Sequence, residues 1–305
     1  MKFSLGVPLM HRGEDNAFLG GEDLVELAQA AERAGFDSFY VTEHPIPGNK
    51  WLSFGGHHAP DPFVTLSWVA ACTTKLRILT NLTVLPYRNP FLLAKTVATL
   101  DRLSNGRMIL GVGTGYLKPE YFAVGVDFEE RNDLFDESID VMRMTWTGEP
   151  VNFVGRHFNA REVSALPRPA QETVPIWIGG NSKLTRRRVA EKAQGWMPMP
   201  NPAAAAKTTR SPVVETLADL AALMPYLTEH AASIGRTEPI DIMFMCFDGG
   251  LPEDPAFDAQ QHLEALHDQA ALGVNYSAVN GAEGSKQQAL DAVARYGEEV
   301  IAKLS

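Results

Sequence analysis

Apolar and polar positions along the chain follow two alternating patterns. Short runs of apolar residues, rich in β-branched and aromatic side chains, are typical of buried strands. The segments between them repeat apolar residues every three or four positions, as the buried face of an α-helix does. The chain therefore alternates strand and helix from end to end. The predicted strands are 2–9, 38–42, 77–85, 107–112, 175–178, 196–199, 240–247 and 274–279.

Residues that favour helix ends mark the segments between the strands. Asp61 is a good N-cap, and Pro62 follows it at the first helical position, where proline is favoured. Gly35 and Gly195 are predicted to end helices, because glycine tolerates the left-handed conformation found there. The predicted helices are 21–34, the segment that begins at residue 62, 90–103, 129–147, 183–194, 213–234, 258–272 and 285–304.

Strands that alternate with helices favour a parallel sheet. Eight such units over 305 residues predict a single α/β domain, a (β/α)8 TIM barrel with insertions. An open doubly wound sheet is the alternative, but its usual glycine fingerprint after the first strand is missing from 5–8. The predicted insertions are 46–60, 149–172, which holds a β-hairpin, and 200–213, a loop rich in alanine, proline and threonine.

The composition of the chain argues against two classes of partner, nucleic acids and membranes. The chain has 27 Lys and Arg against 37 Asp and Glu, so its net charge of −10 argues against nucleic acid as a partner. No apolar run approaches the ~20 residues that span a bilayer, so no membrane association is predicted. Cys72 and Cys246 form no disulfide framework, which suits a cytoplasmic location.

In a (β/α)8 barrel, the active site lies at the carboxyl ends of the strands. Polar or glycine-rich clusters end four of the predicted strands, so we expect them to meet at one rim. They are Glu43 and His44; Asn81, Leu82 and Thr83; Gly113, Thr114 and Gly115; and Gly179, Gly180, Asn181 and Ser182.

His44 is the strongest candidate for proton transfer, because histidine changes its charge near neutral pH. Glu43 could orient it or could face the opposite side of the strand. A structural histidine is the alternative. His57 and His58 lack further metal ligands at a suitable spacing, so no metal site is predicted. His11 is interpreted as a loop histidine.

The glycine turns could hold a ligand. Gly179 and Gly180 let the backbone approach another group, and Ser182 is a good N-cap whose helix start would favour a phosphate. Gly113–Gly115 would let a flat ring lie against the backbone. Ordinary βα turns are the alternative for both. The five tryptophans, including Trp51 and Trp177, are interpreted as packing residues.

Motifs of hydrolases, zinc proteases and P-loop enzymes are missing. A barrel with a phosphate cradle and one rim histidine fits a cofactor that carries the reaction. Seven stretches, in this order, resemble the luciferase-like monooxygenase superfamily. They are 34–38 (AGFDS), 42–45 (TEHP), 85–91 (LPYRNPF), 100–107 (LDRLSNGR), 110–115 (LGVGTG), 146–151 (WTGEPV) and 175–182 (PIWIGGNS).

This resemblance implies a barrel that is often dimeric, and it is greatest to the branch that uses coenzyme F420, a 5-deazaflavin. It places His44 and Glu43 beside the reactive ring, and the cofactor phosphate on Gly179–Ser182. The ring would rest on a bulge within Asn81–Thr83, often with a non-proline cis peptide. In sugar-phosphate dehydrogenases of this branch a glutamate stands where this chain has Tyr116, so glucose 6-phosphate is not expected as substrate.

The resemblance and the residues together predict a cytoplasmic, homodimeric oxidoreductase. It would move a hydride between coenzyme F420 and a small organic substrate, with His44 supplying or accepting the proton. Lys118, Glu120 and Tyr121 are expected to shape the pocket. The alternatives are an FMNH2-dependent monooxygenase that uses O2, a cofactor-free lyase or isomerase acting on a phosphorylated sugar, and a non-catalytic flavin-binding protein.

Overall fold

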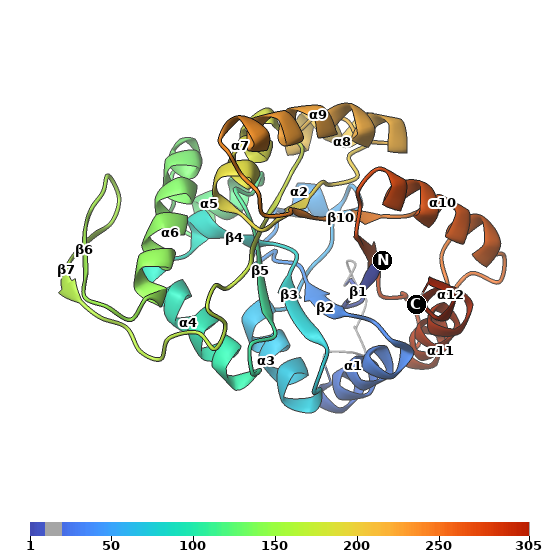
Figure 1. The fold of residues 1–305 in the computed structure, drawn as a ribbon. Coiled ribbons are helices and arrows are strands. Elements are labelled where there is room, and N and C mark those ends of the chain that lie inside the picture. Colours follow the sequence, from blue (N-terminus) through green and yellow to red (C-terminus); the bar gives the residue numbers. More distant parts are fainter. Residues whose placement is uncertain (10–19, 305) are drawn as a thin grey trace.

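Parallel strands close into a barrel, and helices cover its outer surface (Figure 1). The computed structural model describes residues 1–9 and 20–304, so His11 lies outside the described residues. The strand order is β3-β2-β1-β11-β10-β9-β8-β5-β4, and a pairing of β3 with β5 closes the ring. The strands are β1 Lys2–Gly6, β2 Ser38–Val41, β3 Arg77–Thr80, β4 Thr83–Val84, β5 Met108–Gly113, β8 Ile176–Gly179, β9 Gly195–Met197, β10 Asp241–Met245 and β11 Tyr276–Val279.

The third predicted strand is split in two. Strands β3 and β4 are separated by Asn81 and Leu82, and the peptide bond between these two residues is cis. Strand β5 pairs with both pieces, because Ile78 lies opposite Met108 and Thr83 opposite Val112. Counted as one, they complete eight barrel strands, which confirms the predicted (β/α)8 fold.

Most helices begin where the sequence predicts. Asp61 accepts hydrogen bonds from the backbone N–H of Phe63 and Val64, and Ser182 accepts one from Thr185. None of the helices among the described residues is long and apolar enough to cross a bilayer. The main helices are α1 Gly21–Ala34, α3 Pro62–Cys72, α4 Pro90–Leu103, α6 Arg131–Trp146, α7 Lys183–Lys192, α9 Leu217–Ser233, α10 Ala259–Ala271 and α11 Lys286–Tyr296, followed by a π-turn at Gly297–Ile301 and α12 Ala302–Leu304.

The segments outside the repeat differ in part from expectation. The hairpin is confirmed as antiparallel strands β6 Val151–Val154 and β7 Asn159–Val163, which project from the barrel (Figure 1). The predicted loop at 200–213 instead holds α8 Ala203–Thr209, because four successive alanines favour a helix. Gly195 begins β9 rather than ending α7. Short helices not expected from the sequence are α2 Asn49–Leu52, α5 Lys118–Ala123, and the 3-10 turns η2 Leu85–Tyr87 and η3 Phe128–Glu130.

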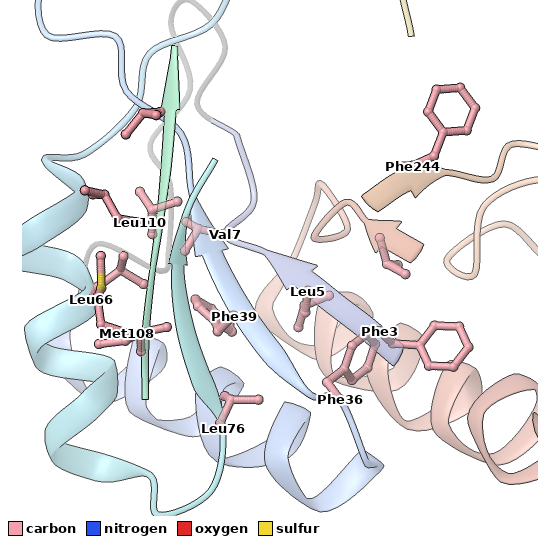
Figure 2. Packing of buried hydrophobic residues seen from close by; sticks show 14 of the residues in the cluster. Phe3, Leu5, Val7, Phe36, Phe39, Leu66, Leu76, Met108, Leu110 and Phe244 are labelled. Carbon is pink, nitrogen blue, oxygen red and sulfur yellow. The ribbon is translucent and has the colours of Figure 1, made fainter. Parts of the chain in front are cut away.

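Alternate residues of each strand face two separate apolar layers. Leu5, Phe39 and Leu110 pack between the strands and the helices, as Figure 2 shows. Their strand neighbours point into the barrel, where a second cluster fills the interior. This inner cluster forms the floor beneath the carboxyl ends of the strands. It consists of Tyr40, Leu79, Ile109, Trp177, Met197, Met243, Tyr276 and Ala278.

Candidate active site

A cavity of about 390 Å³ opens where the barrel strands end at their carboxyl side. Residues that follow β2, β5, β8, β9 and β11 line it, so the expected convergence at one rim is present. Of the predicted site residues, Thr83 and Asn181 are buried but do not line the cavity. Those that do are Glu43, His44, Asn81, Leu82, Gly113, Thr114, Gly115, Gly179, Gly180 and Ser182.

His44 lies in an aromatic surround. Its ring centroid is 4.5 Å from that of Trp51, 5.0 Å from that of His57 and 6.3 Å from that of Tyr116. Burial, and then the nearby Glu120, raise the pKa of Tyr116 to about 12, so its hydroxyl keeps its proton at neutral pH. Trp51 packs against His44 and is not among the residues that line the cavity, as expected of a packing residue.

The carboxylate that contacts His44 belongs to Glu120 on α5. Glu120 Oε1 lies 3.3 Å from His44 Nδ1, and the hydroxyl of Tyr87 donates to Glu120 Oε2 at 3.0 Å. Glu120 is almost fully buried, with 1% of its surface exposed. Burial and then this carboxylate raise the pKa of Tyr87 far above its usual range, which keeps the phenol a donor. Sequence reasoning placed Glu120 near the pocket but did not pair it with His44.

Glu43 faces away from its neighbour His44. Its carboxylate accepts hydrogen bonds from Arg88 Nε at 3.0 Å and from the Val84 backbone N–H at 2.7 Å. Burial raises the pKa of Glu43, while Arg88 and the Val84 N–H oppose that rise. The sequence left two orientations open for Glu43. The structure has the one in which its side chain points away from His44 and binds Arg88 and the Val84 backbone.

The bulge after β3 presents Leu82 to the cavity. A side chain on Gly179 would overlap Leu82, and a Cβ on Gly113 would lie 2.7 Å from Leu82 Cδ1. The two glycines therefore make room for this leucine on the cavity wall. Thr83 turns inward instead, where its hydroxyl has no hydrogen-bond partner among the described residues.

In the turn after β8, some polar groups form hydrogen bonds within the protein and others lie at the cavity. Gly180 has a φ of 113°, which favours glycine, and its N–H donates to Met197. The Asn181 side chain joins Met199 to Pro212, so it holds two loops together and does not reach the cavity. Ser182 caps α7, whose first N–H groups have no acceptor within the helix.

The cavity wall near α7 suits an anionic group. Ser182, Thr185, Arg210 and Ser211 all line it, and the helix N-terminus adds its partial positive charge. Arg210 stacks over the ring of Phe128 at 4.6 Å and has no carboxylate partner among the described residues. These donors fit a phosphate at the Ser182 end of the predicted turn, whereas the N–H groups of Gly180 and Asn181 donate to Met197 and Ser211 within the protein.

The wall across the barrel from the His44 loop is apolar. Four methionines from the ends of β9 and β10 line it, and Tyr40 is held below by a hydrogen bond to Asn280 at 2.9 Å. Apart from the amide of Asn280, this part of the cavity offers few polar contacts to a ligand. The methionines are Met197, Met199, Met243 and Met245.

Comparisons with known proteins agree on one family. A family model described as luciferase-like monooxygenase matches residues 1–294. An F420-dependent glucose-6-phosphate dehydrogenase of Amycolatopsis mediterranei is 35% identical over 182 residues. That match covers 58% of this chain and 53% of the relative, so the chain spans about half the length of this curated relative.

Solved structures share the fold at low sequence identity. A monooxygenase of Streptomyces bottropensis matches with a TM-score of 0.82 at 20% identity, over the whole of both chains. A coenzyme F420-dependent tetrahydromethanopterin reductase of Methanopyrus kandleri gives 0.72 at 17%, also over both whole chains. An FMN complex of 3,6-diketocamphane monooxygenase from Pseudomonas putida gives 0.75 at 17%, over 99% of this chain and 98% of that one.

Proposed function

The chain belongs to the luciferase-like monooxygenase family, and we propose that it is an oxidoreductase that exchanges a hydride between coenzyme F420 and a small organic substrate. One observation carries this proposal. A single cavity has a candidate proton carrier, His44, on its wall and an anion-binding helix start, at Ser182, on the wall as well. The names of the Amycolatopsis and Methanopyrus proteins support F420 as the cofactor.

The chain's own residues would hold the cofactor by its two chemically distinct ends. Ser182, Thr185 and the first N–H groups of α7 would bind its phosphate. Leu82, on the bulge between β3 and β4, would support the ring. The bound deazaflavin would supply the hydride chemistry. His44 would give or take the proton that accompanies the hydride, since it lines the cavity and is only 10% exposed.

We infer that the substrate carries no phosphate of its own. Arg210 is the one lysine or arginine among the described residues that line the cavity, and it stands near the start of α7, where the cofactor phosphate would bind. A second dianion would lack a cationic partner near His44. Tyr116 and the methionine wall suit an uncharged, largely apolar substrate. The substrate would carry one alcohol or carbonyl group.

Binding of the two cofactors tests the proposal. The purified protein is titrated separately with oxidised F420 and with FMN, and binding is followed by the change in their fluorescence. We expect saturable, micromolar or tighter binding of F420. A panel of small alcohols and ketones is then screened for the loss or recovery of F420 absorbance. Tight binding of FMN with none of F420 would overturn the cofactor assignment.

An FMN-dependent monooxygenase is the second candidate. The Streptomyces and Pseudomonas neighbours, described as monooxygenases, favour it, and the second of them is an FMN complex. Oxygen consumption by the protein with chemically reduced FMN and candidate substrates separates the two.

A homodimer and a cytoplasmic location stay predictions. Light scattering checks the first, because a dimer has twice the chain mass of 33.4 kDa.

A further inference from the structure

We propose that Glu120 is a positioning residue that holds His44 in the tautomer with hydrogen on Nδ1. This leaves Nε2 as the atom that exchanges a proton with the substrate. The inference rests on the proposed function only for what His44 does with that proton. The geometry that sets the tautomer belongs to the protein alone.

Each carboxylate oxygen of Glu120 is placed to accept one hydrogen bond. His44 Nδ1 lies 3.3 Å from Oε1, and the Tyr87 hydroxyl donates to Oε2 at 3.0 Å. A carboxylate only accepts hydrogen bonds, so a hydrogen on His44 Nδ1 gives this contact a donor. The opposite tautomer would set the Nδ1 lone pair against a buried carboxylate oxygen, which is unfavourable.

The other ring nitrogen is left available. His44 Nε2 has no hydrogen-bond partner among the described residues. It is also not one of the fully buried side-chain atoms that lack a partner in that part of the chain. Since His44 lines the cavity, this nitrogen is the one that a ligand can reach. The Trp51 ring packs against the His44 ring on the side of the loop, with centroids 4.5 Å apart.

The environment keeps the carboxylate in place. Glu120 is 1% exposed and comes from α5, where the Leu117 carbonyl accepts its backbone N–H. The Tyr87 ring that holds Oε2 itself packs edge-on against Tyr121, with centroids 4.8 Å apart. Glu120 is therefore fixed from two sides before any ligand enters, which is what orientation of a proton carrier requires.

Histidine ¹⁵N NMR of the cofactor-free protein tests the tautomer. Long-range ¹H–¹⁵N spectra at mildly alkaline pH distinguish hydrogen on Nδ1 from hydrogen on Nε2, and His44→Asn assigns the signal. We expect wild-type His44 to carry hydrogen on Nδ1. Glu120→Leu removes both acceptor oxygens, so His44 loses the contact that favours hydrogen on Nδ1 and should shift toward the Nε2–H form. Tyr87→Phe, the matched control, keeps the carboxylate and should leave the tautomer unchanged.

Two outcomes would overturn the inference. One is wild-type His44 with hydrogen on Nε2, and the other is an unchanged tautomer in folded Glu120→Leu. Thermal unfolding confirms that the variants are folded, and Glu120→Asp, which keeps a carboxylate, should restore part of the Nδ1–H form. F420 titration is independent of this readout, so failure to bind F420 would remove the proposed function and leave the tautomer assignment standing. Once a substrate is known, Glu120→Leu should lower kcat about 100-fold with little change in KM for F420.

Discussion

The guanidinium of Arg88 covers the buried carboxylate of Glu43, with Nε 3.0 Å from Oε1. A second contact joins Arg88 Nη2 to Asp61 at 3.0 Å, and the Val84 N–H donates to the far oxygen of Glu43. One ion-pair cluster thus links the end of β2, the strand β4 and the N-cap of α3. Glu43 and Val84 also line the cavity, so the cluster supports the cavity wall next to His44.

Removal of Arg88 should destabilise the protein in a pH-dependent way. Arg88→Ala leaves the Glu43 carboxylate buried without its cation, so we expect a loss of about 3 kcal/mol in the free energy of unfolding at pH 7. Burial already raises the pKa of Glu43, and loss of Arg88 raises it further. The folded variant therefore binds this proton more tightly than the unfolded chain, and the deficit should shrink as pH falls. Urea unfolding at pH 7 and pH 5 measures it, and an equal deficit at both would contradict this account.

Glu32 should stabilise the protein only while it is ionised. Its Oε1 accepts backbone N–H groups of Thr74 at 2.8 Å, Lys75 at 2.6 Å and Leu76 at 2.9 Å. Burial raises the pKa of Glu32, but these donors outweigh it and hold the pKa below the ordinary 4.5. The stabilisation is therefore complete above that pH and disappears as pH falls through the folded-state pKa. Glu32→Gln should lose about 2 kcal/mol at pH 7 and little in strong acid.

The matched control is Glu22→Gln, an exposed change on the same helix. It should alter stability by less than about 0.5 kcal/mol at either pH. Chemical denaturation of the wild type and both variants across pH 3 to 8 gives the comparison. Parallel curves for wild type and Glu32→Gln would exclude the proposed role of the carboxylate.

Two barrel glycines should differ sharply in their tolerance of alanine. A Cβ on Gly111 would overlap the backbone carbonyl of Thr80, which the β3–β5 pairing holds in place, so Gly111→Ala should lose more than about 3 kcal/mol or fail to fold. A Cβ on Gly179 meets only the end of the Leu82 side chain, which can rotate, so Gly179→Ala should lose about 1 kcal/mol. Adding Leu82→Ala should abolish that second effect. Additive losses in the double variant would show that Leu82 is not the obstacle.

Arg210 should contribute to cofactor affinity through charge. If the anionic end of F420 binds at α7, Arg210→Ala should weaken F420 binding about five- to tenfold, and less at high salt. Arg187→Ala is the control, because Arg187 is half exposed on α7 and pairs with Glu191 at 3.8 Å. Fluorescence titration in low and high salt measures both. Equal effects of the two substitutions would mean that only overall charge matters.

Local signals explain why much of the fold could be predicted. Apolar strand runs set the barrel order, and the cap at Asp61 fixed a helix start to the residue, since a cap acts on N–H groups only two and three positions away. The short helices were not predicted, because a helix of one or two turns shows too little apolar periodicity to be recognised. In α8, four alanines carry no apolar stripe, although their intrinsic preference for helix is high.

The position of the candidate cavity at the strand ends was predicted from the sequence, but the contacts between its residues were not. The strand-end rule located His44 and the Gly179 turn, because it depends on topology alone. The partner of His44 is 76 residues away in sequence, and nothing local pairs the two positions. Gly113 and Gly179 were assigned to a ligand, whereas the structure first uses their missing side chains to admit Leu82. Such packing reasons become visible only when distant segments are brought together.

Oxidation of the methionine wall would report which chemistry takes place in the cavity. Thioethers are oxidised to sulfoxides by peroxides, and Met197, Met199, Met243 and Met245 line the cavity in which the reaction is proposed to occur. Hydride exchange produces no oxidant and would leave these sulfurs intact over many turnovers. Peroxide formed by oxygen activation would instead mark them, so mass spectrometry of these peptides after turnover would show which chemistry had taken place.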